Sequence, residues 1–284
     1  MRLIPGDETV DFEDESGRLV GRYVYRNEFK PYLHPVNTPA GHTLTLSMPH
    51  DHRHHRGVMY ALSAADVNFW EEREVRPGEK VGIQKHLGFA SFVEAGDQVG
   101  FEQSVLWTSR DGVLPTFSEA RSLTCESNPD GSGNTWNWKA RLEALRDVRL
   151  IQSHWSHRAA DGRTINYHGL GIRFRREFGG VFQGTTLLLD GVETDFADAL
   201  GQVPRETTFI GTIDGYENPP GAGLTIRQDR QDALFATKDP FPLVCLGPSN
   251  AGPVNLEKGD TITCGYELLA FDGATSPDRG TRAG

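Results

Sequence analysis

Cysteine and long apolar runs are both scarce in this sequence of 284 residues, and each scarcity excludes a class of protein. The three cysteines, Cys125, Cys245 and Cys264, are odd in number and far apart, without CxxC spacing. This usage argues against a disulfide framework and predicts buried thiols in a reducing cytoplasm. Because no run of 18 apolar residues occurs, we expect no membrane-spanning helix.

Positive charge is also in short supply. The chain has 29 Lys and Arg against 39 Asp and Glu, which gives a formal net charge of −10. Nucleic acids and anionic membranes are bound through Lys and Arg contacts to phosphate, so neither is an expected partner. Residues 1–11 are acidic and lack the apolar segment of a signal peptide, and we therefore expect a cytoplasmic protein.

Nucleotide-binding and nucleophile motifs are missing as well. The sequence has no GxGxxG or GxxxxGK[ST] loop and no alternation of strand and helix patterns, which makes a nucleotide-binding fold and a nucleotide cofactor unexpected. It has no GxSxG element that would present a serine nucleophile.

The pattern that is present is one of short strands and turns. Apolar residues alternate with polar ones in many short runs, and six Asp-Gly pairs, a strong hairpin signal, separate those runs. Helical periodicity is limited to two short candidates, 61–71 and 192–202. The sequence therefore predicts an all-β antiparallel sandwich as a single domain over residues 1–272, followed by a disordered tail over 273–284. A homodimer through sheet edges is compatible with this fold.

The histidines are clustered. Six of the ten lie between His34 and His55, and the densest part is Asp51–His55, flanked by Pro49 and Gly57. An extended chain would place His52 and His54 on one face, whereas a helical turn would pair Asp51 with His55. In both geometries two imidazoles can face a single point, and the alternative is a solvated polar turn without a function.

Two kinds of chemistry suit this cluster. Imidazole binds divalent Mn, Zn, Fe or Ni, so we assign His52 and His54 as metal ligands and His86, which begins a predicted strand, as a possible third. Asp51 or His55 would then orient a ligand or carry a proton. Without a metal, neutral and protonated histidines would act as base and acid near pH 7.

Four sequence segments around the cluster resemble the bacterial family labelled "methane oxygenase PmoA". These are Lys30-Pro-Tyr-Leu-His-Pro, Thr38-Pro-Ala-Gly, Pro49-x-Asp-His-x-His-His-x-Gly and Val67-Asn-Phe-Trp. The resemblance implies a carbohydrate-pathway protein with a galactose-mutarotase-like β-supersandwich, acting on a sugar or glycoside. The family's late Pro-x-x-Trp-His stretch has no counterpart here, where Asp239-Pro-Phe241 stands instead.

Charged residues elsewhere give further candidates. Arg173 alternates with apolar neighbours and could bind a sugar or a carboxylate through its fork of donors, or cover a sheet face. Glu119 is a candidate catalytic carboxylate, with an ion pair to Arg121 on the same strand face as the alternative. Glu71 and Glu72 could supply a carboxylate, although an acidic surface turn is the commoner outcome for such a pair.

Taken together, these features predict a carbohydrate-active enzyme. The favoured mechanism is metal-assisted proton abstraction on an oxidised sugar, leading to elimination, hydration or epimerisation. One alternative is a metal-free aldose epimerase of the mutarotase type, and another is a sugar- or metal-binding protein without turnover.

Overall fold

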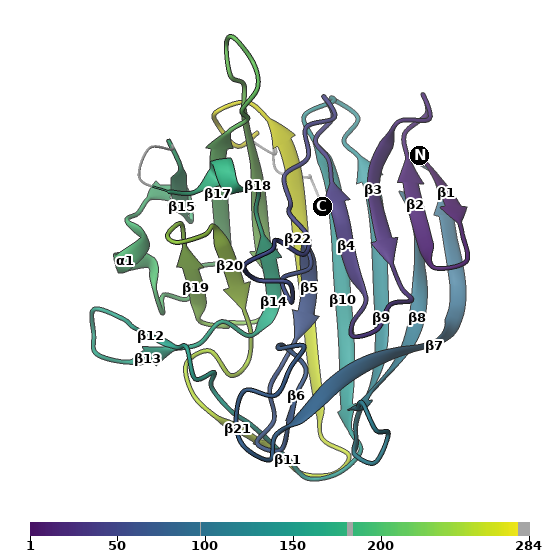
Figure 1. The fold of residues 1–284 in the computed structure, drawn as a ribbon. Coiled ribbons are helices and arrows are strands. Elements are labelled where there is room, and N and C mark those ends of the chain that lie inside the picture. The colour runs from purple at the N-terminus through teal and green to yellow at the C-terminus, as the bar shows by residue number, and fades with distance from the viewer. Residues whose placement is uncertain (97, 181–183, 278–284) are drawn as a thin grey trace.

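Two large β-sheets packed face to face make up most of the computed structural model, which describes residues 1–96, 98–180 and 184–277 (Figure 1). The eight-stranded sheet consists, in spatial order, of β1 (Arg2–Pro5), β2 (Thr9–Glu13), β3 (Leu19–Val24), β4 (Tyr32–Val36), β5 (Val58–Ala61), β14 (Gly169–Arg173), β20 (Leu243–Leu246) and β19 (Leu234–Thr237).

The second sheet has ten strands and contains the longest ones. Its spatial order is β16 (Val192–Glu193), β15 (Thr186–Leu189), β17 (Glu206–Thr212), β18 (Gly221–Gln228), β22 (Thr261–Asp272), β10 (Asn134–Ala144), β9 (Pro115–Ser127), β8 (Gln98–Ser109), β7 (Lys80–Ala95) and β6 (Val67–Asn68). The remaining elements are the pair β11 (Val148–Leu150) and β21 (Val254–Leu256), the pair β12 (His157–Arg158) and β13 (Thr164–Ile165), the 3-10 turn η1 (Arg176–Phe178) and the helix α1 (Phe196–Ala199).

The core between the two sheets follows from the alternation in the sequence. In β10, Trp136 and Trp138 are fully buried, whereas Lys139 and Arg141 are exposed, because successive side chains of a strand point to opposite faces. The Trp136 ring packs edge-on against Phe12 of the opposite sheet, with ring centroids 4.8 Å apart. Such contacts between the sheets bury most of the apolar surface and hold the sandwich together.

A second apolar layer covers the outer face of the eight-stranded sheet. Its centre is Trp70, which lies over β14 and is fully buried. Gly171 of β14 makes this possible, since a Cβ there would lie 2.6 Å from the Trp70 ring. The buried members of this layer are Tyr32, Met59, Ala61, Trp70, Ala159, Ile165, Tyr167, Phe235, Leu243 and Cys245.

The predicted all-β sandwich is confirmed, and its strand pairs are antiparallel except for the parallel pair of β6 and β7. In the described residues, helix is limited to η1 and α1, and α1 lies within the helical candidate 192–202. The candidate 61–71 contains β6 and a turn instead. The Asn68 side chain accepts hydrogen bonds from the backbone N–H groups of Trp70 and Glu71, which stabilises a turn in place of a helix.

The predicted Asp-Gly hairpin is seen most clearly between β15 and β16. Asp190 and Gly191 have φ angles of 49° and 81° and connect the paired residues Leu189 and Val192. Positive φ at both central residues is the requirement of a type I′ turn.

Three further expectations concern cysteines, membranes and the tail. Cys125, Cys245 and Cys264 are buried and unpaired, as predicted. Within the described ranges, no helix has the length and apolar character needed to cross a membrane. Residues 278–284 of the predicted tail lie outside the described part of the chain, and the single domain over 1–272 stays a prediction.

Candidate functional site

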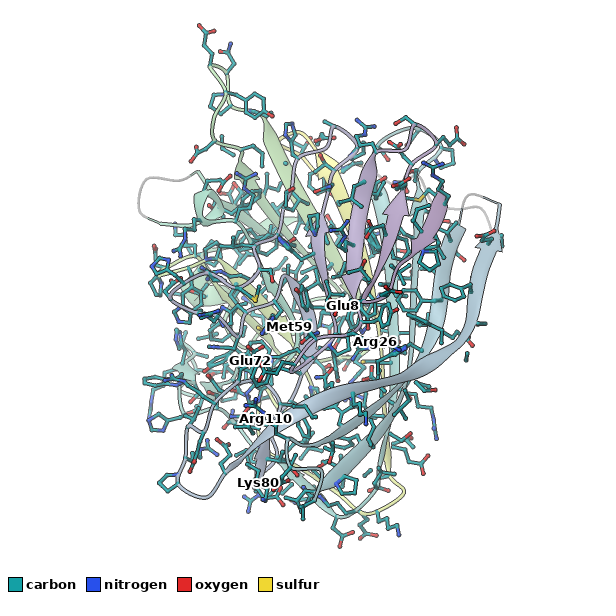
Figure 2. All side chains as sticks on the ribbon, turned by 45° about the vertical axis from the view of Figure 1, so that its right-hand side comes forward. Glu8, Arg26, Met59, Glu72, Lys80 and Arg110 are labelled. Carbon is teal, nitrogen blue, oxygen red and sulfur yellow. The ribbon has the colours of Figure 1, made fainter. Side chains whose placement is uncertain are left out.

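A cavity of about 870 Å³ opens on the outer face of the eight-stranded sheet, beside the apolar layer around Trp70. Segments far apart in the sequence form its wall, and one of the lining residues, Glu72, is labelled in Figure 2. The lining residues are Glu28, Phe29, Met48, His50, Asp51, His52, Arg53, His54, His55, Arg56, Glu71, Glu72, Arg73, Trp155, His157, Tyr167, Phe235, Thr237, Asp239, Pro240, Phe241 and Leu243.

The histidine cluster forms a tight loop, which is neither the extended strand nor the helix considered from the sequence. The N–H of His52 donates to the carbonyl oxygen of Pro49, and that of His55 donates to the carbonyl oxygen of His52. Gly57, with a φ of 65°, brings the chain back into the sheet. A Cβ at this position would lie 2.6 Å from the carbonyl oxygen of Leu33, so the return path requires glycine.

This loop brings three imidazole rings together. The ring centroids of His54 and His55 are 4.5 Å apart, those of His52 and His55 are 5.0 Å apart, and those of His52 and His54 are 5.9 Å apart. Even so, among the described residues no group of three or more His, Cys, Asp or Glu side chains is placed to hold a metal ion. The ligand roles predicted for His52 and His54 therefore find no support in their arrangement and stay predictions.

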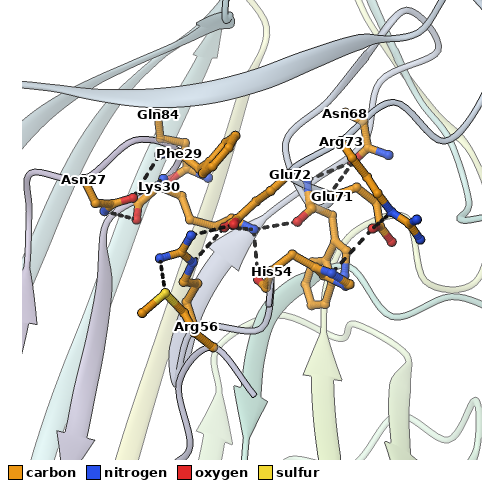
Figure 3. A network of polar contacts seen from close by, with 12 residues as sticks. Asn27, Phe29, Lys30, His54, Arg56, Asn68, Glu71, Glu72, Arg73 and Gln84 are labelled. Atoms are coloured by element: carbon orange, nitrogen blue, oxygen red, sulfur yellow. Dashed lines mark hydrogen bonds and ion pairs between the residues drawn. The ribbon is translucent and has the colours of Figure 1, made fainter. Parts of the chain in front are cut away.

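A buried lysine joins the histidine loop to the segment that follows β6 (Figure 3). The Nζ of Lys30 donates to the carbonyl oxygen of His54 at 3.2 Å and to that of Trp70 at 2.5 Å. Its charge is balanced by Glu72, whose Oε1 lies 3.6 Å away and which also forms a two-point ion pair with Arg56. Burial nevertheless lowers the pKa of Lys30 to about 8. Lys30 thus holds the two loops at a fixed separation.

Because of this connection, His54 faces a carboxylate. The Nδ1 of His54 lies 3.5 Å from Oε2 of Glu71, which also has Arg73 Nε at 3.8 Å (Figure 3). Glu71 is only 5% exposed, so the acidic surface turn expected for it is wrong. Burial raises the pKa of Glu71, whereas burial and the charge of Lys30 lower the pKa of His54 to about 2. At pH 7 the imidazole of His54 is therefore neutral, and the neighbouring carboxyl group can stabilise the positive charge of a protonated His54.

Asp51 has a different role in the same loop. Its Oδ1 accepts a hydrogen bond of 2.6 Å from Arg176, and its Oδ2 lies 3.3 Å from Nδ1 of His52. Although burial acts in the opposite direction, the hydrogen bond from Arg176 lowers the pKa of Asp51. Of the two roles predicted for Asp51, this arrangement supports orientation of a histidine over transport of a proton.

His55 and Arg173 form the inner part of the site. His55 is 2% exposed, and its Nδ1 has no hydrogen-bond partner among the described residues. Burial lowers its pKa well below the usual value. Arg173, at the end of β14, is not a lining residue, but its guanidinium carbon lies 4.4 Å from the ring centroid of Phe241, which is one.

The structure does not bring His86 and Glu119 to the cavity. The ring of His86 on β7 contacts Gln103 at 2.7 Å and Tyr25, between the sheets. Glu119 is also in the inner core, where both of its oxygens pair with Arg121. Both residues lie on the inner side of the eight-stranded sheet, whereas the cavity lies on its outer face. Glu119 therefore forms the ion pair with Arg121 that was the alternative to a catalytic role.

Several contributors to the site were assigned no role in it from the sequence, among them Lys30, Tyr167 and Phe241. Lys30 stands in the Lys-Pro-Tyr segment quoted above, but its burial against the histidine loop is a feature of the tertiary structure and cannot be read from the sequence. Tyr167 and Phe241 come from distant parts of the chain, and nothing in their local patterns indicated that they lie beside the histidine loop.

The buried histidines predict a loss of stability in mild acid. Burial lowers the pKa of His34 to about 4, of His54 to about 2 and of His168 to about 3, all below the 6.5 of an unperturbed histidine. The unfolded chain therefore binds protons first as the pH falls. Stability is fully present above pH 6.5 and should decrease below it by about 1.4 kcal/mol per pH unit for each histidine.

Urea unfolding between pH 7.5 and 5 measures this slope. His168→Gln should make the slope shallower by about one histidine's share, and an unchanged slope in that variant would contradict the assignment.

Solved structures similar to this chain include three galactose mutarotase-like proteins. The galactose mutarotase related enzyme from Lactobacillus acidophilus is 6% identical, with 98% of this chain and 99% of that chain covered and a TM-score of 0.38. A galactose mutarotase-like protein from Lactobacillus casei is 9% identical, with coverages of 95% and 99% and a TM-score of 0.36. The one from Clostridium acetobutylicum is 9% identical, with coverages of 93% and 92% and a TM-score of 0.33.

Sequence comparison corrects the expected family. No curated protein matches the chain. A family model does match residues 11–283, and it describes a family of unknown function, DUF6807. Nothing links the chain to the family labelled PmoA, so that resemblance was wrong, and the carbohydrate-pathway role that it implied loses this support. The match spans nearly the whole chain, which therefore belongs to the family of unknown function DUF6807.

Proposed function

We propose that the protein is an enzyme that transfers protons on a carbohydrate bound in the cavity. The observation that carries this proposal is the pairing of the His54 imidazole with the buried Glu71 carboxyl group in the cavity wall. In the tautomer that carries its proton on Nδ1, the nitrogen beside Glu71, His54 would accept a proton from a substrate through Nε2. The carboxylate then stabilises the imidazolium that forms.

The lining of the cavity suits a sugar. Aromatic rings of Trp155, Tyr167, Phe235 and Phe241 offer flat apolar surfaces, and the histidines offer hydrogen-bond donors and acceptors. Sites for small molecules typically combine an apolar wall with a few directed polar groups. A cavity of about 870 Å³ is large enough for a monosaccharide or disaccharide.

No step is assigned to a metal ion, because no group of three or more ligating side chains is placed to hold one in the part of the chain that the structure describes. Proton transfer by His54 can serve either of two reactions. In ring opening of an aldose it would accept the proton of the anomeric hydroxyl group while the bond between C1 and the ring oxygen breaks with its electrons on the ring oxygen. After rotation about the bond between C1 and C2, the ring oxygen would attack the other face of the aldehyde, and His54 would return the proton to the hydroxyl oxygen. In elimination from a keto-glycoside it would accept the proton from the carbon beside the carbonyl group, and the glycosidic bond would break with its electrons on the leaving oxygen.

Separate incubations with aldoses and with 3-keto-glycosides, before and after dialysis against EDTA, test the proposal. NMR exchange between anomers follows the first reaction, and chromatography follows loss of the second substrate. We expect turnover of one class at a rate that EDTA leaves unchanged. Loss of turnover in EDTA with recovery on adding Mn²⁺ or Zn²⁺ would support the metal mechanism instead. Binding without turnover of either class would make the protein a sugar-binding protein.

A further inference from the structure

The guanidinium group of Arg173 is buried without a partner. Arg173 is 0% exposed, and none of its three side-chain nitrogens, Nε, Nη1 and Nη2, has a hydrogen-bond partner among the described residues. Buried arginines are normally paired, since an unpaired charge in a protein interior is strongly unfavourable. By contrast, the buried Arg121 forms two hydrogen bonds with Glu119 and another with Tyr23.

Arg173 lies directly behind the cavity wall. The ring of Phe241 covers its guanidinium carbon at 4.4 Å, and the same ring contacts His52 at 4.2 Å and His55 at 5.2 Å between centroids. The Nδ1 of His55 is likewise buried and without a hydrogen-bond partner in the part of the chain that the structure describes. Four nitrogen atoms, three of Arg173 and one of His55, thus lack hydrogen-bond partners among the described residues at this end of the cavity.

The charges nearby do not satisfy Arg173. Asp51 acts on it electrostatically, but its Oδ1 is held by Arg176 at 2.6 Å. His54 and His55 are neutral at pH 7, since burial lowers the pKa of both. Arg173 is therefore a cation without a bound counter-charge, next to a site for a small molecule.

We propose that the ligand of this cavity carries a carboxylate, which Arg173 binds after the Phe241 ring moves aside. This inference rests on the proposed function and names its substrate class, a sugar acid in place of a neutral sugar. A planar carboxylate matches two parallel N–H donors of a guanidinium group. A phosphate group, with about twice the charge, fits less well because Asp51 lies nearby and Arg176 is already bound by it.

A bound carboxylate would also help the proposed chemistry. Burial is the largest cause of the lowered pKa of His55 and His54. The positive charge of Arg173 lowers the pKa of His55 further, and Lys30, Arg73 and Arg56 do so for His54. A negative charge in the cavity counteracts these effects and makes both imidazoles better proton acceptors. The substrate would then contribute to activating its own base.

Thermal unfolding with matched sugars tests the proposal in the full chain. The probes are D-glucuronate, D-galacturonate and D-gluconate, against D-glucose, D-galactose and glucose 6-phosphate. At a concentration one hundred times its Kd, a ligand that carries a carboxylate should raise the Tm of the protein by roughly 5–10 °C. The neutral sugars should give a smaller shift, and Arg173→Met should lose the shift caused by the acids. Arg149→Met, which changes an exposed arginine on β11, is the matched control and should keep it.

Arg173→Met alone gives a second readout that needs no ligand. Methionine fills a similar volume without the charge, so the Tm of this variant should be equal to or higher than that of the wild type. A clearly lower Tm would mean that the guanidinium group stabilises the fold, and would overturn the proposal. Equal shifts from acids and neutral sugars, no shift from any acid, or the largest shift from glucose 6-phosphate would also overturn it.

The outcomes separate this inference from the proposed function. His54→Gln should keep the shift caused by the acid, because His54 is not part of the carboxylate site. If wild-type protein binds the acid through Arg173 but turns over no sugar, the proposed function fails and the carboxylate site stands.

Discussion

Replacement of His54 by glutamine should reduce kcat by about 10²–10⁴-fold, the usual contribution of a positioned acid–base group. Glutamine keeps hydrogen-bonding ability and similar size, but it cannot accept a proton at neutral pH. Glu71→Gln should give a loss of about 10²-fold, since His54 would keep its place without the charge that stabilises its protonated form. Both rates are measured at saturating substrate, with Tm as the check on folding.

His154→Gln is the control for this experiment. His154 is exposed and does not line the cavity, so its replacement should leave kcat and KM unchanged. If His54→Gln kept more than half of the wild-type kcat while His154→Gln also remained active, His54 would not be the base.

The second large effect concerns stability and the buried pair of Glu119 and Arg121. Both side chains are 0% exposed, and two hydrogen bonds of 2.6 and 2.8 Å join them. Trp107 donates to Glu119 at 2.6 Å, and Arg121 donates to Tyr23 of the opposite sheet at 2.9 Å. Glu119→Gln should lower the free energy of unfolding by about 3–5 kcal/mol, because it leaves the Arg121 charge without a counter-ion.

A double-mutant cycle in urea separates the pair from its surroundings. Arg121→Met should have an effect of similar size, and the combined variant Glu119→Gln/Arg121→Met should lose less than the two single losses together. Strictly additive losses would show that the two residues act independently. Catalytic parameters of the folded variants should be unchanged, because neither side chain reaches the cavity.

Local patterns in the sequence were sufficient to predict much of the fold. Alternation in β10 predicted which of its faces is buried, and the Asp190-Gly191 pair predicted a two-residue hairpin. Both features are determined by residues adjacent in the sequence, so they can be predicted without knowledge of the tertiary structure. The turn at Asn68 was missed, since the apolar spacing of 61–71 resembles a helix and the side-chain hydrogen bond that prevents one is not visible in that spacing.

The candidate site could be predicted only in part. The histidine loop is a local feature, and His52, His54 and His55 do line the cavity. The partners of these residues are not local. Glu71 is buried in a loop that Lys30 connects to the backbone of His54. Glu119 was a plausible catalytic carboxylate from the sequence, but in the structure it is buried between the two sheets and paired with Arg121.

The position of β22 has a consequence for how the protein is made. This strand follows the other described strands in sequence, yet it lies in the middle of the ten-stranded sheet, between β18 and β10. Until the ribosome releases it, β10 and β18 each present an open edge, and open edges promote association between chains. A lower expression level, which leaves fewer nascent chains close to one another, should therefore favour soluble product, since each chain can then pair its own β22 before a neighbouring chain occupies that position.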